Sequence, residues 1–253
     1  MQKLKNFTIL FILSMFFVVV GSPSPNVLAS PDAVAPNLGS AASFVALASS
    51  TLTNTGPGVF IGNVGTSPGT SVVGFPPGKV INGSIYMGGP VPALAQTDAK
   101  TAYNVLKGRV CDVNMTGKDL GGKKLLPNVY CFNTSAQLTG NLVLDARGNP
   151  NAIWVFQTGS TMTSASASTV VVINGGNALN VFWQVGSSAT FGTGTRFKGN
   201  ILAYASITFV TGASLTGRAL ALNGAVTLDT NGSPYPIAIN PLYQNIYLPL
   251  IRH

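Results

Sequence analysis

The sequence has 253 residues, of which 46% are hydrophobic and only 8% are charged, whereas an ordinary soluble domain carries about 25% charged residues. All six acidic residues are scattered aspartates, glutamate is absent, and the single histidine is the last residue, His253, so the paired carboxylates and histidine triads of hydrolases are excluded. The net charge of +8 is not gathered in a basic stretch interleaved with aromatic residues. We therefore predict no enzyme, no catalytic residue, no cofactor or metal ion, no small-molecule substrate and no nucleic-acid partner.

The N-terminal segment 1–29 has the pattern of a secretory signal peptide. Two lysines precede an apolar run over residues 7–20, and a stretch rich in proline and serine leads to Ala29. The alternative is a membrane anchor, but about fourteen apolar residues are short for a span of roughly 20. We predict cleavage after Ala29 and a secreted or cell-surface protein.

The rest of the chain divides into a short linker, one domain and a tail. Residues 30–37 form the linker, residues 38–232 the domain, and the apolar residues 233–253 a C-terminal tail that either covers an edge of the domain or serves in sorting or surface attachment. Within the domain, the segment 92–109 opens with proline, carries apolar residues at helical spacing, and ends in Lys-Gly-Arg. It predicts one amphipathic helix whose alanine-rich face packs against a flat surface.

The only two cysteines, Cys111 and Cys131, follow this helix. In an exported protein they predict a structural disulfide, which would contribute about 3 kcal/mol on the chain-entropy model. Two buried free thiols are the alternative, and a zinc site is disfavoured because too few partner ligands are available.

Short apolar runs broken by glycine, asparagine and proline fill the remainder of the domain and indicate strands and turns. Five of these runs align: "SSTLTNTG", "STMTSAS", "SATFGTG", "SITFVTG" and "AVTLDTN". One column of this alignment holds Thr51, Thr161, Thr190, Thr208 and Thr227, and another holds Asn54, Ser164, Thr193, Thr211 and Thr230.

The spacing of the aligned threonines predicts the architecture. Thr190, Thr208 and Thr227 are separated by 18 and then 19 residues, which is the length of one coil of a β-solenoid. Because side chains alternate along a strand, Thr208 faces outward when its two neighbours face the core. Stacked coils would then align the threonines at the inter-strand distance of about 4.7 to 4.9 Å. The sequence leaves open whether the N-terminal coils precede the C-terminal ones or stack beside them.

Several longer motifs occur together and in order between Leu38 and Asn231. They are "GFPPG", "AQTDAKTAYN", "NAIWVFQTGSTMT" and "NVFWQVGSSATFGTGTRFKGNILAYASITFVTGASLTGRALALNGAVTLDTN". With these motifs the domain resembles the secreted microbial ice-binding proteins, the ice-binding-like or DUF3494 family. The resemblance implies an all-β solenoid, namely an irregular right-handed parallel β-helix of triangular section with one α-helix packed alongside.

The resemblance also implies that the flattest face adsorbs to ice and inhibits its growth and recrystallisation. A motif similar to T-A/G-x-T/N recurs on the binding face of the family, and segments 164–167, 193–196 and 211–214 correspond to it here. Together with the threonine columns, it implies that ice is bound by Thr161, Thr190, Thr193, Thr195, Thr208, Thr211, Ser214, Thr227 and Thr230.

Four residues depart from this pattern. Arg196 and Ala167 replace residues of the motif, and Val210 and Asp229 are expected to interrupt the outward run of threonines. The expected partners are an ice surface and its ordered water, bound by a monomer. The alternative that stays open is a structural or adhesive cell-surface module on the same scaffold.

Overall fold

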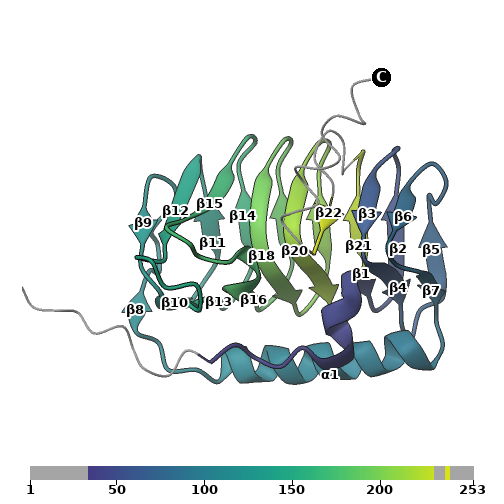
Figure 1. Cartoon of the computed structure of the whole chain (residues 1–253), viewed down its shortest axis with the longest axis horizontal. Helices are drawn as coiled ribbons and strands as arrows, with labels where there is room; N and C mark the ends of the chain where they lie inside the picture. The colour runs from purple at the N-terminus through teal and green to yellow at the C-terminus, as the bar shows by residue number, and fades with distance from the viewer. Residues whose placement is uncertain (1–33, 231–236, 240–253) are drawn as a thin grey trace, which may run out of the picture.

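The computed structural model describes residues 34–230 and 237–239, so the predicted signal peptide and most of the predicted tail lie outside it. The described residues coil into a solenoid in which all pairings between named strands are parallel. The α-helix α1 (Pro90–Lys107) runs alongside the stacked coils (Figure 1). The predicted β-helix with one helix beside it is confirmed.

Three faces run along the solenoid, and we name them the helix face, the threonine face and the third face. The helix face, against which α1 packs, contains β8 (Val113–Asn114), β10 (Asn128–Phe132), β13 (Trp154–Thr158), β16 (Val181–Val185), β1 (Phe44–Ala48), β4 (Asn63–Thr66) and β7 (Ile85–Met87). The threonine face contains β11 (Ala136–Leu138), β14 (Met162–Ser164), β17 (Ala189–Phe191), β19 (Ile207–Phe209), β21 (Val226–Leu228), β2 (Thr51–Asn54) and β5 (Ser71–Val73). The third face contains β9 (Lys124–Leu125), β12 (Asn141–Asp145), β15 (Thr169–Ile173), β22 (Ile237–Ala238), β3 (Val59–Ile61) and β6 (Lys79–Ile81).

Two long strands, β18 (Arg196–Ala203) and β20 (Ser214–Ala221), begin on the third face and end on the helix face. They turn the corner at Gly199 and Gly217, whose φ angles are 117° and 144°. The two glycines are paired, and a Cβ on Gly217 would lie 2.0 Å from the carbonyl oxygen of Gly199. Only glycine fits such a close backbone approach, so these positions make the corner possible.

The order of the coils in space differs from their order in the sequence. β20 pairs with β1, β21 with β2, and β22 with β3, so the last coil stacks on the first. Figure 1 shows the same arrangement, with β1 beside β20 and the coil of β4 and β5 beyond it. We call this junction between the last and first coils the seam, and it joins the two groups of coils that the helix and the cysteine loop separate in the sequence.

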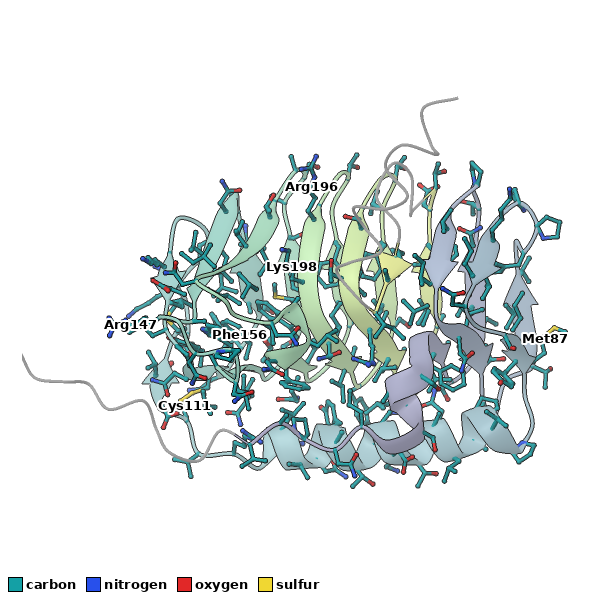
Figure 2. The ribbon with its side chains drawn as sticks, viewed as in Figure 1. Met87, Cys111, Arg147, Phe156, Arg196 and Lys198 are labelled. Carbon is teal, nitrogen blue, oxygen red and sulfur yellow. A yellow bond between two sulfur atoms is a disulfide. The ribbon has the colours of Figure 1, made fainter. Side chains whose placement is uncertain are left out.

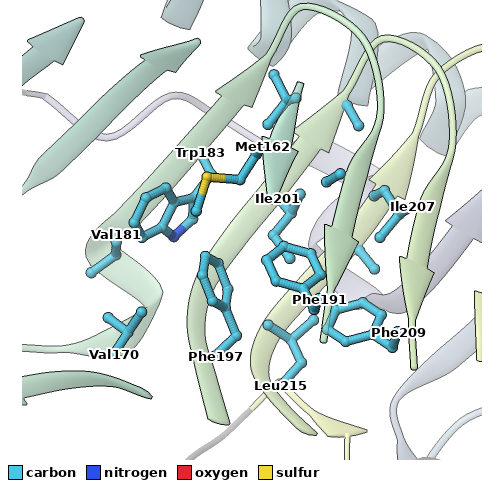
Figure 3. Close-up of a cluster of buried hydrophobic side chains, with 14 of the residues drawn as sticks. Met162, Val170, Val181, Trp183, Phe191, Phe197, Ile201, Ile207, Phe209 and Leu215 are labelled. Carbon is cyan, nitrogen blue, oxygen red and sulfur yellow. The ribbon is translucent and has the colours of Figure 1, made fainter. Parts of the chain in front are cut away.

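The core is filled by side chains that point inward from all three faces. Trp183 stacks on Phe156 with ring centroids 4.0 Å apart and contacts Phe197 at 4.7 Å. Phe191 contacts Phe197 at 4.3 Å and stacks on Phe209 at 4.7 Å (Figure 3). Since these rings come from strands of different faces, they couple the faces through one core.

The helix α1 covers the helix face along the solenoid. It starts two residues before the predicted segment 92–109 and ends at Lys107, with a proline at its first position and Gly108 as its C-cap. Its buried side chains include Ala95, Ala99 and Ala102, which pack against outward residues of the sheet. Small alanine side chains permit this close contact, so the predicted alanine-rich packing face is confirmed. Two 3₁₀ turns, η1 (Gly39–Ser43) and η2 (Ala178–Asn180), complete the described elements.

The disulfide between Cys111 and Cys131 is present and its Cα atoms are 5.8 Å apart. Cys131 lies on β10, so the bond ties the chain that leaves α1 to the end of the solenoid. This pairing was the expected one.

The C-terminal boundary of the domain lies beyond the predicted residue 232. Ile237 is fully buried in the core, and β22 pairs with both β20 and β3. This strand therefore belongs to the solenoid and not to a separate tail. Three apolar residues and an asparagine between two prolines are too short a run for a strand pattern to be recognised in the sequence.

Candidate functional site

The threonine face is a sheet of seven strands in the order β11-β14-β17-β19-β21-β2-β5. α1 packs on a different face, against strands such as β13, β16 and β18. The pairings of β14 with β17, of β17 with β19 and of β19 with β21 have no register shift. The outward side chains of these strands therefore form straight columns across the coils.

The middle column of this face is made of threonine. Pairing places one outward threonine beside the next on five successive strands, Thr163, Thr190, Thr208, Thr227 and Thr53. Gln137 continues the column at one end and Val73 at the other. Neighbouring strands lie about 4.7 to 4.9 Å apart, so the column repeats its methyl and hydroxyl groups at that distance.

Alternation within each strand explains why the threonines point outward. Ala189 and Phe191 flank Thr190 and are buried, and Ile207 and Phe209 flank Thr208 in the same way. Because successive side chains of a strand point to opposite sides, burial of these neighbours fixes the direction of the threonines.

Thr161 lies in a different column from the one we predicted. The column two residues before the threonines holds Ser135, Thr161, Ser188, Ser206, Ala225, Thr51 and Ser71. The hydroxyls of Ser135 and Thr161 are 2.8 Å apart, and Ser206 Oγ accepts from the backbone N–H of Ala225 at 3.2 Å. The residues that the structure places beside Thr190 and Thr227 are Thr163 and Thr53, which the sequence alignment missed.

The alignment was wrong by two residues for a physical reason. It matched Leu52 and Met162 to the buried phenylalanines of the other coils, whereas the structure puts Asn54 and Ser164 at those inward positions. Both polar side chains are buried and hydrogen-bonded, Asn54 to the carbonyl oxygens of Gly56 and Gly74 at 2.6 and 2.9 Å. A shift of two residues leaves the outward-facing pattern unchanged, so alternation alone could not reveal it.

Thr195 and Ser214 are buried, and the prediction that they contact ice is wrong. Thr195 is fully buried, its hydroxyl lies 2.8 Å from that of Ser164, and it donates to the carbonyl oxygen of Ala165 at 3.2 Å. Ser214, the first residue of β20, is only 4% exposed. The chain turns at Gly194 and Gly212 before these residues, which changes the direction of the following side chains.

Thr193, Thr211 and Thr230 lie together where the chain leaves the threonine face. The backbone N–H of Gly194 donates to the carbonyl oxygen of Thr211, and that of Gly212 donates to Thr230, so the three threonines are on adjacent coils. Thr193 and Thr211 are exposed and Thr230 is half-buried. They form a corner column beside the face.

Arg196, which departs from the expected motif, lies outside the threonine face. It is the first residue of β18 and pairs with Thr169 and Ser214 on the third face. Figure 2 shows Arg196 and Lys198 along β18. Ala167 is also outside the seven strands, in the turn between β14 and β15.

Val210 and Asp229 do lie on the threonine face, in a column two residues after the threonines. The backbone N–H of Val210 donates to Phe191 and that of Asp229 donates to Phe209, which continues the register of the strands. None of the seven strands contains a charged residue, so the Asp229 carboxylate is a charge at the border of a neutral sheet. Hydroxyl donors, Thr211 first and then Thr55, hold its pKa below the usual range.

Within residues 34–230 and 237–239, no three His, Cys, Asp or Glu side chains gather in a way that could hold a metal ion. Among the same residues no helix is long and apolar enough to span a bilayer.

Comparison with known proteins places this architecture in a family. The model of the ice-binding-like family matches residues 46–233. A protein named ice-binding protein from Nostoc sp. (strain HG1) is 56% identical over 195 residues, which are 77% of this chain and 72% of the relative. The crystal structure of an ice-binding protein from the Antarctic ascomycete Antarctomyces psychrotrophicus has a TM-score of 0.75 and 39% identity, covering 78% of this chain and 97% of that chain. An ice-binding protein from an Antarctic biological consortium also has a TM-score of 0.75, with 45% identity and coverage of 78% and 90%. The chain therefore belongs to the ice-binding-like family.

Proposed function

We propose that this protein binds ice through the threonine face and thereby inhibits ice growth and recrystallisation. The observation that carries the proposal is the middle column, in which five threonines follow one another in register on adjacent parallel strands. Membership of the ice-binding-like family supports the same function.

In this proposal the threonine face binds ice by ordering a layer of water, without a chemical reaction. Threonine methyl groups restrict the water that covers them, while hydroxyl and backbone groups hydrogen-bond to it. Since the groups repeat at the strand spacing, the ordered layer can join an ice plane of similar repeat. Adsorbed molecules then pin the growing ice front, and growth between them becomes unfavourable.

Rigidity makes weak contacts sufficient. Immobilising a flexible side chain at an interface costs about 0.5 to 1.5 kcal/mol, but β-branched threonine is already restricted at χ1. The buried neighbours Ala189, Phe191, Ile207 and Phe209 hold the strands in place from below. The surface is therefore arranged before it meets ice.

The residues proposed to contact ice are the threonines of the middle column, Thr161 in the preceding column, and the corner threonines Thr193, Thr211 and Thr230. We further infer that the protein acts outside the cell as a monomer and has no enzyme activity. Membership of the ice-binding-like family supports these inferences. The neutral strands of the face fit an ice surface, which offers no charged group to recognise.

A single bulky substitution tests the face. Thr208 is in the centre of the middle column, and Thr208→Tyr inserts a ring that lifts the face from a flat surface. We expect the concentration needed to inhibit recrystallisation to rise at least about tenfold, a factor that corresponds to 1.4 kcal/mol. The matched control is Thr169→Tyr on β15 of the third face, which should leave the activity unchanged.

Two outcomes would contradict the proposal. If wild-type protein at micromolar concentration has no effect on ice crystals, the proposed ice-binding function is wrong. The alternative function, an adhesive or structural module, would then be favoured. Equal losses from the Thr208 and Thr169 variants would show that ice is bound elsewhere than on the threonine face.

A further inference from the structure

The carboxylate of Asp229 lies at the seam, where the last coil of the chain stacks on the first. β21, which precedes Asp229, pairs with β2 of the first coil on one side and with β19 on the other. We propose that Asp229 is a positioning residue of the ice-binding face, which orients the hydroxyls of Thr55, Thr211 and Thr230 across three adjacent coils. This inference rests on the proposed function.

Three threonine hydroxyls donate to this one carboxylate. Thr211 Oγ1 donates to Oδ2 at 2.5 Å, and Thr55 Oγ1 donates to Oδ1 at 2.8 Å. Thr230 Oγ1 donates to Oδ1 at 3.2 Å. Thr55 is 174 residues from Asp229 in the sequence, so these bonds connect the two groups of coils that meet at the seam.

The hydrogen bonds make a negative charge compatible with an ice-binding surface. A carboxylate has about four acceptor positions, and a bare one would orient water around its charge and disturb an ice-like layer. Here three hydroxyls fill most of those positions, and the pKa of Asp229 lies below its usual range because of them. Most of the hydrogen-bonding capacity of the carboxylate is therefore used by the protein and not by water.

The same bonds determine what the threonines present to water. A hydroxyl has one proton, and hydrogen bonds to an ionised acceptor are about twice as strong as those between neutral groups. When Thr55 and Thr211 donate that proton to Asp229, only their lone pairs remain for water. Both side chains are exposed, so they present acceptors of fixed direction beside the middle column.

The neighbouring coil explains why Thr211 takes part. In the column of Asp229, the adjacent coil offers Val210, which has no hydroxyl. Thr211, the next residue of that coil, supplies the donor instead. Val210 and Asp229, which appear in the sequence as interruptions of the array, thus form part of one local arrangement.

Asp229→Asn tests this role because an amide keeps the size of the side chain but can accept through only one of its two polar atoms. NMR three-bond couplings of Thr55 and Thr211 report their χ1 rotamers without any ice. In the wild type we expect a single χ1 rotamer at both threonines, and in the variant we expect averaging between rotamers at one or both. The variant should also need a roughly threefold higher concentration to inhibit recrystallisation, as the loss of a hydrogen bond predicts. Asp145→Asn on the third face is the matched control and should change neither readout.

A double substitution separates positioning from a general structural effect. In a Thr55→Val, Thr211→Val background, Asp229→Asn should cause a smaller further loss of activity than in the wild type, because only the Thr230 hydroxyl is left for Asp229 to orient. Unchanged rotamers and activity in Asp229→Asn would overturn the inference, as would an equal loss in both backgrounds. Inactive wild-type protein would instead overturn the proposed function, and the rotamer measurement would still decide whether Asp229 orients the threonines.

Discussion

The threonine face and the third face are built from the same coils, yet only one of them is uniform. On the threonine face, the outward residues of β14, β17, β19, β21 and β2 are threonines in register. On the third face, the corresponding positions of β12, β15 and β18 hold Val143, Val171 and Lys198. Parallel stacking gives both faces the same strand spacing. The repeat distance therefore comes from the fold, whereas the surface proposed to match ice comes from one residue type repeated at one position.

The largest effect should come from the core that both faces share. Trp183 stacks on Phe156 and contacts Phe197, which in turn contacts Phe191 behind the threonine face. Trp183→Ala should lower the free energy of unfolding by about 3 to 5 kcal/mol, because it leaves a large cavity. Denaturant unfolding measures this loss. A decrease below about 1 kcal/mol would show that the faces do not depend on a common core.

A smaller effect is expected from a substitution on the threonine face that changes ice binding but not stability. Thr190→Val removes one hydroxyl from the middle column and retains the branched shape, so stability should change by no more than about 0.5 kcal/mol. Loss of a hydrogen bond of about 0.5 to 1.5 kcal/mol predicts a roughly two- to tenfold higher concentration for recrystallisation inhibition.

The matched substitution Thr169→Val on the third face should leave that concentration unchanged. A comparable loss at Thr169 would mean that the uniform column has no special role.

The smallest effect concerns the charges that the third face carries. Asp145, at the end of β12, accepts hydrogen bonds from Lys124 Nζ at 2.7 Å, from the Arg147 backbone at 2.9 Å and from Asn174 at 2.6 Å. The Lys124 interaction first, and then the other donors, lower the pKa of Asp145 from 3.8 to about 2. Because the folded-state pKa is the lower one, the stabilisation is complete above about pH 4 and is lost as the pH falls toward 2.

Thermal unfolding at pH 6, 4, 3 and 2 measures this dependence. The midpoint of the wild type should fall more steeply below pH 4 than that of Asp145→Asn. Parallel curves for the two proteins would show that Asp145 does not contribute. The threonine strands carry no ionisable side chain, so their column should not add to this slope.

Much of the fold could be predicted from local sequence signals. The helix was located to within two residues at each end, because its proline, its alanine spacing and its glycine stop act over a single helix. The disulfide follows from the presence of only two cysteines in a chain with an export signal. Thr190, Thr208 and Thr227 share one column because their spacing is that of a coil.

Other features depended on contacts between distant segments. The seam pairs residues such as Thr53 and Thr227 that have no local relation, and no repeat spacing crosses the helix and the cysteine loop. Arg196 was expected on the binding face, whereas the chain turns at Gly194 and Arg196 then pairs with Thr169 and Ser214 of neighbouring coils.

The sequence by itself determined that the chain forms parallel coils with threonine at regular intervals, because alternation and coil length are properties of neighbouring residues. Tertiary structure decided which threonines share a column. Thr53 and Thr163 share the column of Thr190 in a register that buries Asn54 and Ser164, whose side chains find hydrogen-bond partners on other coils and turns. A buried amide or hydroxyl donor is costly without such a partner, and a partner from another segment is visible only in the folded chain.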